Sequence, residues 1–156
     1  MKTRLVAMSL AIALISSACT QARATEESPA FSSVPATNTP QGGRDYSTTR
    51  TSDAGVYTVS FEPDGSPIAI NKIQTWTIHV ETADGTLVDD AAIAVGGGMP
   101  EHGHGLPTQP EVTENLGGGD YKVEGIKFQM PGWWIVTFDI DSEAGHDSVT
   151  FNLQLN

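Results

Sequence analysis

The feature that most constrains this chain is an alternation of apolar and polar side chains with a period of two residues. In the stretch KIQTWTIHVE, Trp76, Ile78 and Val80 share one face, because successive side chains of an extended strand point to opposite sides. The stretches WWIVTFDI and SVTFNLQL repeat the pattern and add these residues to the predicted core: Trp134, Val136, Phe138, Ile140, Val149, Phe151, Leu153 and Leu155. No stretch shows the 3.6-residue period of an amphipathic helix. The sequence therefore predicts an all-β fold.

Turn-forming residues separate these stretches and define the expected strands. PDGSP, ADG and GGGD each place glycine where a tight turn needs it. Short strands at this spacing favour a single immunoglobulin-like antiparallel β-sandwich of about seven strands, formed by residues 54–156. The strands are expected at residues 56–62, 73–82, 91–96, 111–115, 121–128, 133–139 and 148–155.

Residues 1–24 have the layout of a bacterial export signal: a basic start, an apolar run and then small residues. The apolar run is too short to remain as a membrane span. Two processing sites fit. In the first, Cys19 becomes the lipidated first residue of a lipoprotein, although Ser16 stands where such signals usually carry Leu, Val or Ile. In the second, cleavage follows the A-x-A motif that ends at Ala24. Both predict an exported protein, either periplasmic or lipid-anchored to the cell envelope.

Residues 25–53 are predicted to be a flexible tether between the signal and the domain. They are rich in Ser, Thr, Pro, Gly, Asn and Gln, and they contain few large apolar side chains. Such a segment buries too little apolar surface to offset the entropy lost on ordering.

Charge and residue content limit the function classes. The chain has eight Lys and Arg against 19 Asp and Glu, a formal net charge of −11. This acidity disfavours nucleic acid as a partner. The one cysteine lies in the signal, no H-E-x-x-H motif is present, and Asp89 and Asp90 are adjacent in sequence, so they do not form a facing dyad. We expect no enzymatic activity.

A candidate metal site is suggested by the stretch GGGMPEHGHGLPTQP, which carries Met99, His102 and His104. Met130 follows the fifth expected strand. Since the loops after the first, third and fifth strands emerge at one end of an alternating sandwich, Met130 is expected beside that stretch. Thioether and imidazole ligands together suit Cu(I), so the four residues are predicted to bind copper, with Glu101 as a further oxygen ligand or a support. The alternative is a metal-free loop in which Met130 fills the end of the sandwich.

The region from Gly55 to the end resembles the YtkA-like domain, a relative of the FixH-type domain of exported or membrane-tethered bacterial proteins. The resemblance rests on M-P-x-H-x-H-G, a G-x-Y strand and M-P-G-W-W within MPEHGHGLPTQPEVTENLGGGDYKVEGIKFQMPGWWIVTFDI. It implies a small β-sandwich outside the cytoplasm without enzymatic activity. It also implies a link to copper handling or to the maturation of respiratory enzymes, with a metalloprotein or a membrane-bound complex as partner. The alternative is a metal-free interaction module, tethered to the envelope, that contacts such a complex.

Overall fold

The computed structural model describes residues 43–156, so the export signal, Cys19 and most of the predicted tether lie outside the described residues. The described chain forms nine strands and one short 3-10 helix. Their bounds are β1 (Thr49–Thr51), β2 (Tyr57–Pro63), β3 (Gln74–Thr82), β4 (Ala92–Met99), η1 (Pro100–His102), β5 (His104–Gly105), β6 (Glu111–Gly117), β7 (Asp120–Ile126), β8 (Gly132–Ser142) and β9 (Gly145–Leu155). Within residues 43–156, no helix has the length and apolar character needed to cross a membrane.

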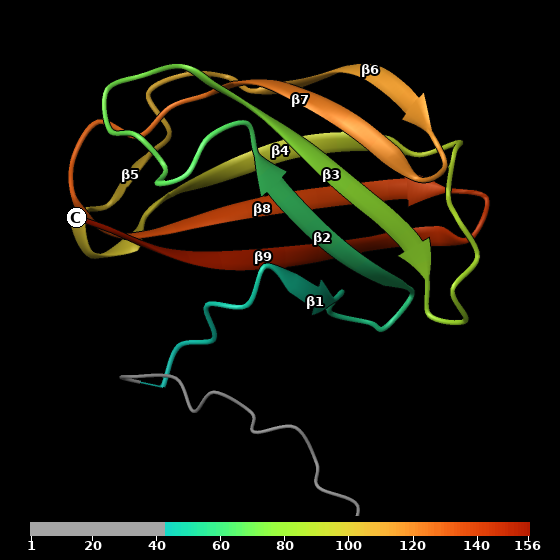
Figure 1. Cartoon of the computed structure of the whole chain (residues 1–156). Helices are drawn as coiled ribbons and strands as arrows, with labels where there is room; N and C mark the ends of the chain where they lie inside the picture. The colour runs from blue at the N-terminus through green and yellow to red at the C-terminus, as the bar shows by residue number, and fades with distance from the viewer. Residues whose placement is uncertain (1–42) are drawn as a thin grey trace, which may run out of the picture. The chain divides into compact units, whose positions relative to one another are not determined.

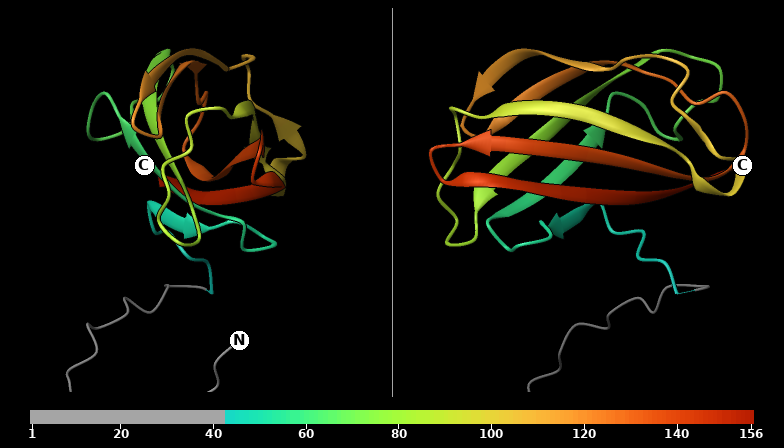
Figure 2. Two further views of the ribbon diagram at one scale, coloured as in Figure 1. Left: turned by 90° about the vertical axis from the view of Figure 1, so that its right-hand side faces the viewer. Right: turned by 180° about the vertical axis from the view of Figure 1, so that it is seen from behind.

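The strands are antiparallel, in the order β1-β2-β3-β7-β6-β4-β8-β9, with β5 on the edge of β4. The register between β6 and β4 consists of one pair, Ala94 with Glu111, so the sheet folds over at this point. In Figure 1, β2 and β3 cross in front of β4, β8 and β9. Seen end-on in Figure 2, the strands surround a central core. The order β2-β3-β7-β6 on one layer and β4-β8-β9 on the other is that of an immunoglobulin-like sandwich, which confirms the predicted fold.

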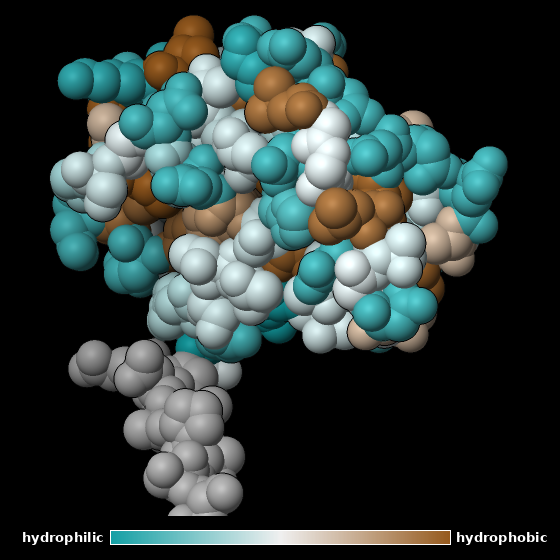
Figure 3. Space-filling model, turned by 45° about the vertical axis from the view of Figure 1, so that its right-hand side comes forward, coloured by the Kyte–Doolittle hydropathy of each residue, from teal (hydrophilic) through white to brown (hydrophobic). Residues whose placement is uncertain are grey.

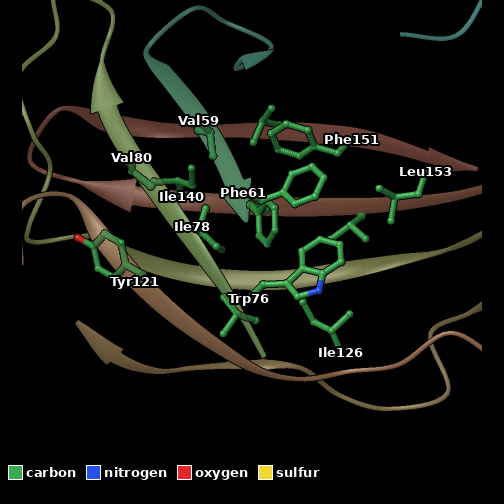
Figure 4. Close-up of a cluster of buried hydrophobic side chains, with 14 of the residues drawn as sticks. Val59, Phe61, Trp76, Ile78, Val80, Tyr121, Ile126, Ile140, Phe151 and Leu153 are labelled. Carbon is green, nitrogen blue, oxygen red and sulfur yellow. The ribbon is translucent and has the colours of Figure 1, made fainter. Parts of the chain in front are cut away.

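The core consists of the side chains predicted from the alternation. Trp76, Ile78 and Val80 of β3 are fully buried, as are Trp134, Val136, Phe138 and Ile140 of β8. Figure 4 shows the β3 residues in one cluster with Phe151 and Leu153 of β9. Phe61 stacks on the Trp76 ring at 4.6 Å between centroids and meets Phe151 edge-on at 4.9 Å, so aromatic contacts join the two layers.

The apolar side chains left on the surface are few and separate. Among the described residues, the large hydrophobic side chains that are exposed are Tyr46, Ile73, Leu87 and Leu116. On the face drawn in Figure 3, the apolar patches are separated by hydrophilic residues. This face therefore shows no continuous apolar surface of the kind that marks a protein-protein interface.

All seven predicted strands are present, but the boundary drawn between tether and domain at residue 54 is wrong. Residues 49–51 form β1, which pairs with β2. Arg50 donates to Thr150 O at 2.6 Å, and Asp53 N donates to Ser148 O at 2.8 Å. Polar and backbone groups hold this segment on β2 and β9, and such contacts leave no hydrophobic periodicity in the sequence. Residues 49–53 therefore belong to the folded domain.

Asp147 fixes the turn between β1 and β2. Its side chain is 6 % exposed, and its carboxylate accepts hydrogen bonds from Ala54 N at 3.0 Å, Val56 N at 3.2 Å and Ser148 N at 2.8 Å. Burial by itself raises the pKa of Asp147, but the hydrogen bonds from the Ser52 hydroxyl and these amides outweigh it and lower the pKa from 3.8 to about 2. The charged form is therefore the one that the native structure favours.

We expect the D147N variant to lose about 2 kcal/mol of stability at pH 7, because its neutral amide replaces a carboxylate held by several N–H groups. Since the native pKa lies below the unfolded value, this contribution is complete above about pH 4 and disappears as the pH falls toward 2. Urea unfolding at pH 7 and pH 2 checks this: the difference between wild type and D147N should shrink at the lower pH. D53N, at an exposed position in the same turn, is the control. An equal difference at both pH values would contradict the prediction.

Candidate metal site

The stretch with Met99, His102 and His104 forms a tight hairpin at the end of β4. The 3-10 helix η1 follows Met99 directly, ends at His102 and is capped by Gly103, whose φ of 67° lies in the left-handed region that favours glycine. The Gly103 amide donates to Met99 O at 3.0 Å, which closes the turn. The chain then returns as β5, which pairs with β4 through Gly98 with Gly105 and Met99 with His104. The hairpin lies with the C-terminus and the β7–β8 loop at one end of the sandwich (Figure 1).

Gly98 allows β5 to lie against β4. A Cβ atom at this position would stand 2.5 Å from His104 O and 3.0 Å from Gly105 Cα, so neither strand could keep its place. We therefore expect the G98A variant to be about 1–3 kcal/mol less stable, because the hairpin must open. Thermal unfolding followed by tryptophan emission measures this.

G96A is the matched control, since a Cβ atom on Gly96 meets nothing within 4 Å. We expect it to unfold at nearly the same temperature as the wild type. If G96A and G98A are equally destabilised, the close packing of β5 on β4 is not the cause.

Met99 and His104 are direct neighbours across the hairpin. Residues paired in register on antiparallel strands project to the same face, with Cβ atoms about 5 Å apart. Met99 is 2 % exposed, and its methyl group lies over Gly132, where a Cβ atom would collide with it. The thioether of Met99 and the imidazole of His104 therefore share the inner side of the hairpin.

His104 contacts the loop that precedes β8 and the start of β8 itself, besides its own neighbour Gly105. Its Nδ1 lies 3.1 Å from Gly105 O and 3.3 Å from Gln129 Nε2, and its ring meets the edge of Trp134 at 5.5 Å between centroids. A backbone carbonyl only accepts hydrogen bonds, so the contact with Gly105 places the proton on Nδ1 and leaves the Nε2 lone pair free. Gln129 Oε1 is buried without a partner, and turning the amide presents it to the same N–H. Metal-binding histidines commonly donate their second ring N–H to an oxygen in this way.

The other two predicted ligands are His102 and Met130. The His102 side chain is exposed, and its ring centroid lies 5.9 Å from that of His104. Met130 is half-buried and packs against the core, and its carbonyl accepts a hydrogen bond from Trp134 Nε1 at 3.0 Å. Gln129 of the β7–β8 loop and Trp134 of β8 lie against His104, while the expected convergence of the Met130 side chain on the hairpin stays a prediction.

Acidic side chains do not complete the group. Within residues 43–156, no three His, Cys, Asp or Glu side chains gather as ligands for one ion, so a site at this end depends on thioether sulfur. Glu101, the carboxylate expected to support the ligands, instead forms an ion pair with Arg44, with Arg44 Nη2 3.0 Å from its Oε1. The other two histidines lie elsewhere: His79 pairs with Asp120 at 2.7 Å, and His146 lies opposite Asp141 at the far end of β8.

Sequence reasoning missed three residues at this end: Arg44, Gln129 and Trp134. Gln129 and Trp134 flank Met130 in QMPGWW, and the direction argument that located Met130 applies to them equally. Arg44 had no such signal, because it lies in the segment assigned to the tether. Trp133, next to Trp134, packs across the outer face of β8, as consecutive strand residues must.

The fold and its end hairpin define a small immunoglobulin-like β-sandwich domain with a methionine and histidine group at one end. The chain belongs to the YtkA-like family, whose model matches residues 51–139. No curated protein matches the chain. Among solved structures, the ZirS C-terminal domain is similar, with 15% sequence identity, coverage of 86% of this chain and 88% of that chain, and a TM-score of 0.36.

Proposed function

We propose that this protein is a non-enzymatic β-sandwich of the cell envelope that binds copper through Met99, His102, His104 and Met130. Residues 1–24 direct its export, and Cys19 anchors it if the lipoprotein site is used. The bound ion is passed to a metalloprotein or to a membrane-bound respiratory or copper-handling complex. The donor set supports Cu(I), because thioether sulfur is soft and imidazole binds both oxidation states. The domain has no thiolate of the kind that structural zinc sites use.

The observation that carries this proposal is the spacing of the two imidazoles. A metal–nitrogen bond of about 2 Å places a ring centre about 3.2 Å from the ion, so two ligating rings have centres at most about 6.4 Å apart. The His102 and His104 centroids are 5.9 Å apart, within this limit. The Nδ1 contact of His104 with Gly105 O leaves Nε2 as the coordinating atom. Met99, in register with His104, supplies a sulfur on the same side.

One observation favours the alternative, a metal-free module that contacts a membrane-bound complex. Met99 is nearly fully buried, with its methyl group over Gly132, and Met130 packs against the core. Both methionines therefore also serve as packing residues at the end of the sandwich. In that case His102 and the hairpin surface would be contacts for the partner.

Copper titration of the purified full-length protein separates the two functions. The proposal expects saturable uptake of one Cu(I) per chain in competition with a chromogenic Cu(I) chelator. Because Trp134 lies against His104, Cu(II) bound at the hairpin should also quench tryptophan emission. Absence of saturable binding of either ion would overturn the copper function and leave the metal-free module.

A further inference from the structure

The segment before β1 is fixed to the hairpin by Arg44. The guanidinium lies over the indole of Trp133, with Arg44 Cζ 3.7 Å from the ring centroid, and its Nη2 reaches Glu101 Oε1 at 3.0 Å. The planar guanidinium thus makes a cation–π contact and an ion pair at once. Residue 44 and residue 101 are far apart in sequence, so the contact connects the start of the described chain to the candidate metal loop.

Hydrogen bonds hold this arrangement on the outer face of β8 and β9. Trp133 Nε1 donates to Asn152 Oδ1 at 3.0 Å, and Asn152 Nδ2 donates to Asp45 O at 2.8 Å. The indole that supports Arg44 and the backbone next to Arg44 are therefore held by the same asparagine. The guanidinium is positioned by two independent contacts, so its place does not depend on Glu101 alone.

Glu101 is the one carboxylate between Met99 and Pro110, and it directly precedes His102. A carboxylate is a hard oxygen ligand that suits Cu(II) and other divalent ions, whereas Cu(I) prefers the sulfur and imidazole donors. While Arg44 holds Oε1, it fixes the orientation of the Glu101 carboxylate and offsets its charge, so ligation of an ion beside His102 competes with the ion pair. The ion pair thus withholds the Glu101 carboxylate, the hard oxygen donor, from an ion at the loop and leaves the thioether and imidazole donors available.

We infer that Arg44 determines the oxidation-state preference of the loop: it sequesters Glu101 and thereby favours Cu(I) over Cu(II). This inference rests on the proposed copper function and adds a specificity-determining residue outside the proposed ligands. The R44Q variant frees Glu101. Cu(II) affinity should then rise by about fivefold, the factor that corresponds to the strength of an exposed ion pair, and Cu(I) affinity should stay within about twofold.

The test measures Cu(I) and Cu(II) affinities of the full-length protein by chelator competition for wild type, R44Q, E101Q and the double variant R44Q/E101Q. The gain in Cu(II) affinity should be absent in the double variant relative to E101Q, because it requires the freed carboxylate. K72Q removes one positive charge from an exposed position in the β2–β3 loop and is the charge-matched control. It should leave the ratio of the two affinities unchanged.

A second measurement needs no metal. Trp76 and Trp134 are fully buried and Trp133 is half-buried, so acrylamide quenching of tryptophan emission reports mainly on Trp133. Removing the guanidinium in R44Q should increase this quenching, and K72Q should not. Equal quenching in wild type and R44Q would overturn the placement of Arg44 over the indole.

The outcomes separate the two proposals. Two results would overturn the role of Arg44 and leave the copper function standing, provided that the wild type binds Cu(I). In the first, R44Q leaves the ratio of the Cu(I) and Cu(II) affinities unchanged. In the second, R44Q raises Cu(II) affinity by the same factor in the E101Q background. If the wild-type protein binds neither ion, the copper function is overturned and this inference with it.

Discussion

We expect the H102A/H104A double variant to bind Cu(I) at least about a hundredfold more weakly than the wild type. Loss of an outer-shell partner alone typically costs about 10–100-fold in metal affinity, and this variant loses two direct ligands. The two thioethers that remain come from separate elements, the hairpin and the β7–β8 loop, and Met99 is nearly fully buried. Chelator competition with the full-length protein measures the change.

The matched control is H79Q/H146Q, which removes the same number of imidazoles from other parts of the domain. His79 lies on the outer face of β3 against Asp120, and His146 is exposed at the start of β9. We expect this variant to keep wild-type Cu(I) affinity within about twofold. Equal losses in the two double variants would mean that copper binds to surface imidazoles in general, which would contradict a specific site at the hairpin. Thermal unfolding of both variants checks that each is folded.

The largest expected effect on stability is that of W76A, about 3–5 kcal/mol. The Trp76 side chain is fully buried, stacks on Phe61 and contacts Phe128 at 6.0 Å between centroids. Its removal leaves a large cavity where aromatic contacts join the two layers. I73A is the control: Ile73 lies just before the same strand but is 69 % exposed, so its truncation should cost less than about 0.5 kcal/mol. Urea unfolding at pH 7 measures both.

W76F tests the physical cause of this effect. Trp76 Nε1 is buried and has no hydrogen-bond partner within residues 43–156. Phenylalanine keeps most of the stacking on Phe61 and removes the unpaired N–H, so W76F should keep more than half of the stability that W76A loses. If W76F is as unstable as W76A, the stacking on Phe61 is not the main contribution of this residue.

The faces of the strands could be predicted from the sequence because they depend on local alternation. Trp76, Phe138 and Phe151 are buried as the period of two residues requires. The end of the sandwich that carries Met130 followed from counting strand directions, which needs only the number of elements between two loops. Both inferences use information contained within a strand or in the order of strands.

The short strands β1 and β5 could not be predicted in the same way. β5 consists of His104 and Gly105, too short to show any alternation, and it exists because glycine at position 98 lets the chain approach. β1 is held by its pairing with β2 and by Arg50 on Thr150 O. Neither strand depends on an apolar pattern. A prediction from composition therefore places residues 49–51 in the tether.

The sequence by itself determined the all-β class, the inward faces of the strands and the residue types at the candidate site, since these follow from local pattern and ligand chemistry. The tertiary structure decided which partner each site residue has. It placed Gln129 and Trp134 against His104, buried Met99 over Gly132 and paired Glu101 with Arg44. These contacts join residues from separate strands and loops, and single polar contacts between distant positions leave no periodic signal in a sequence.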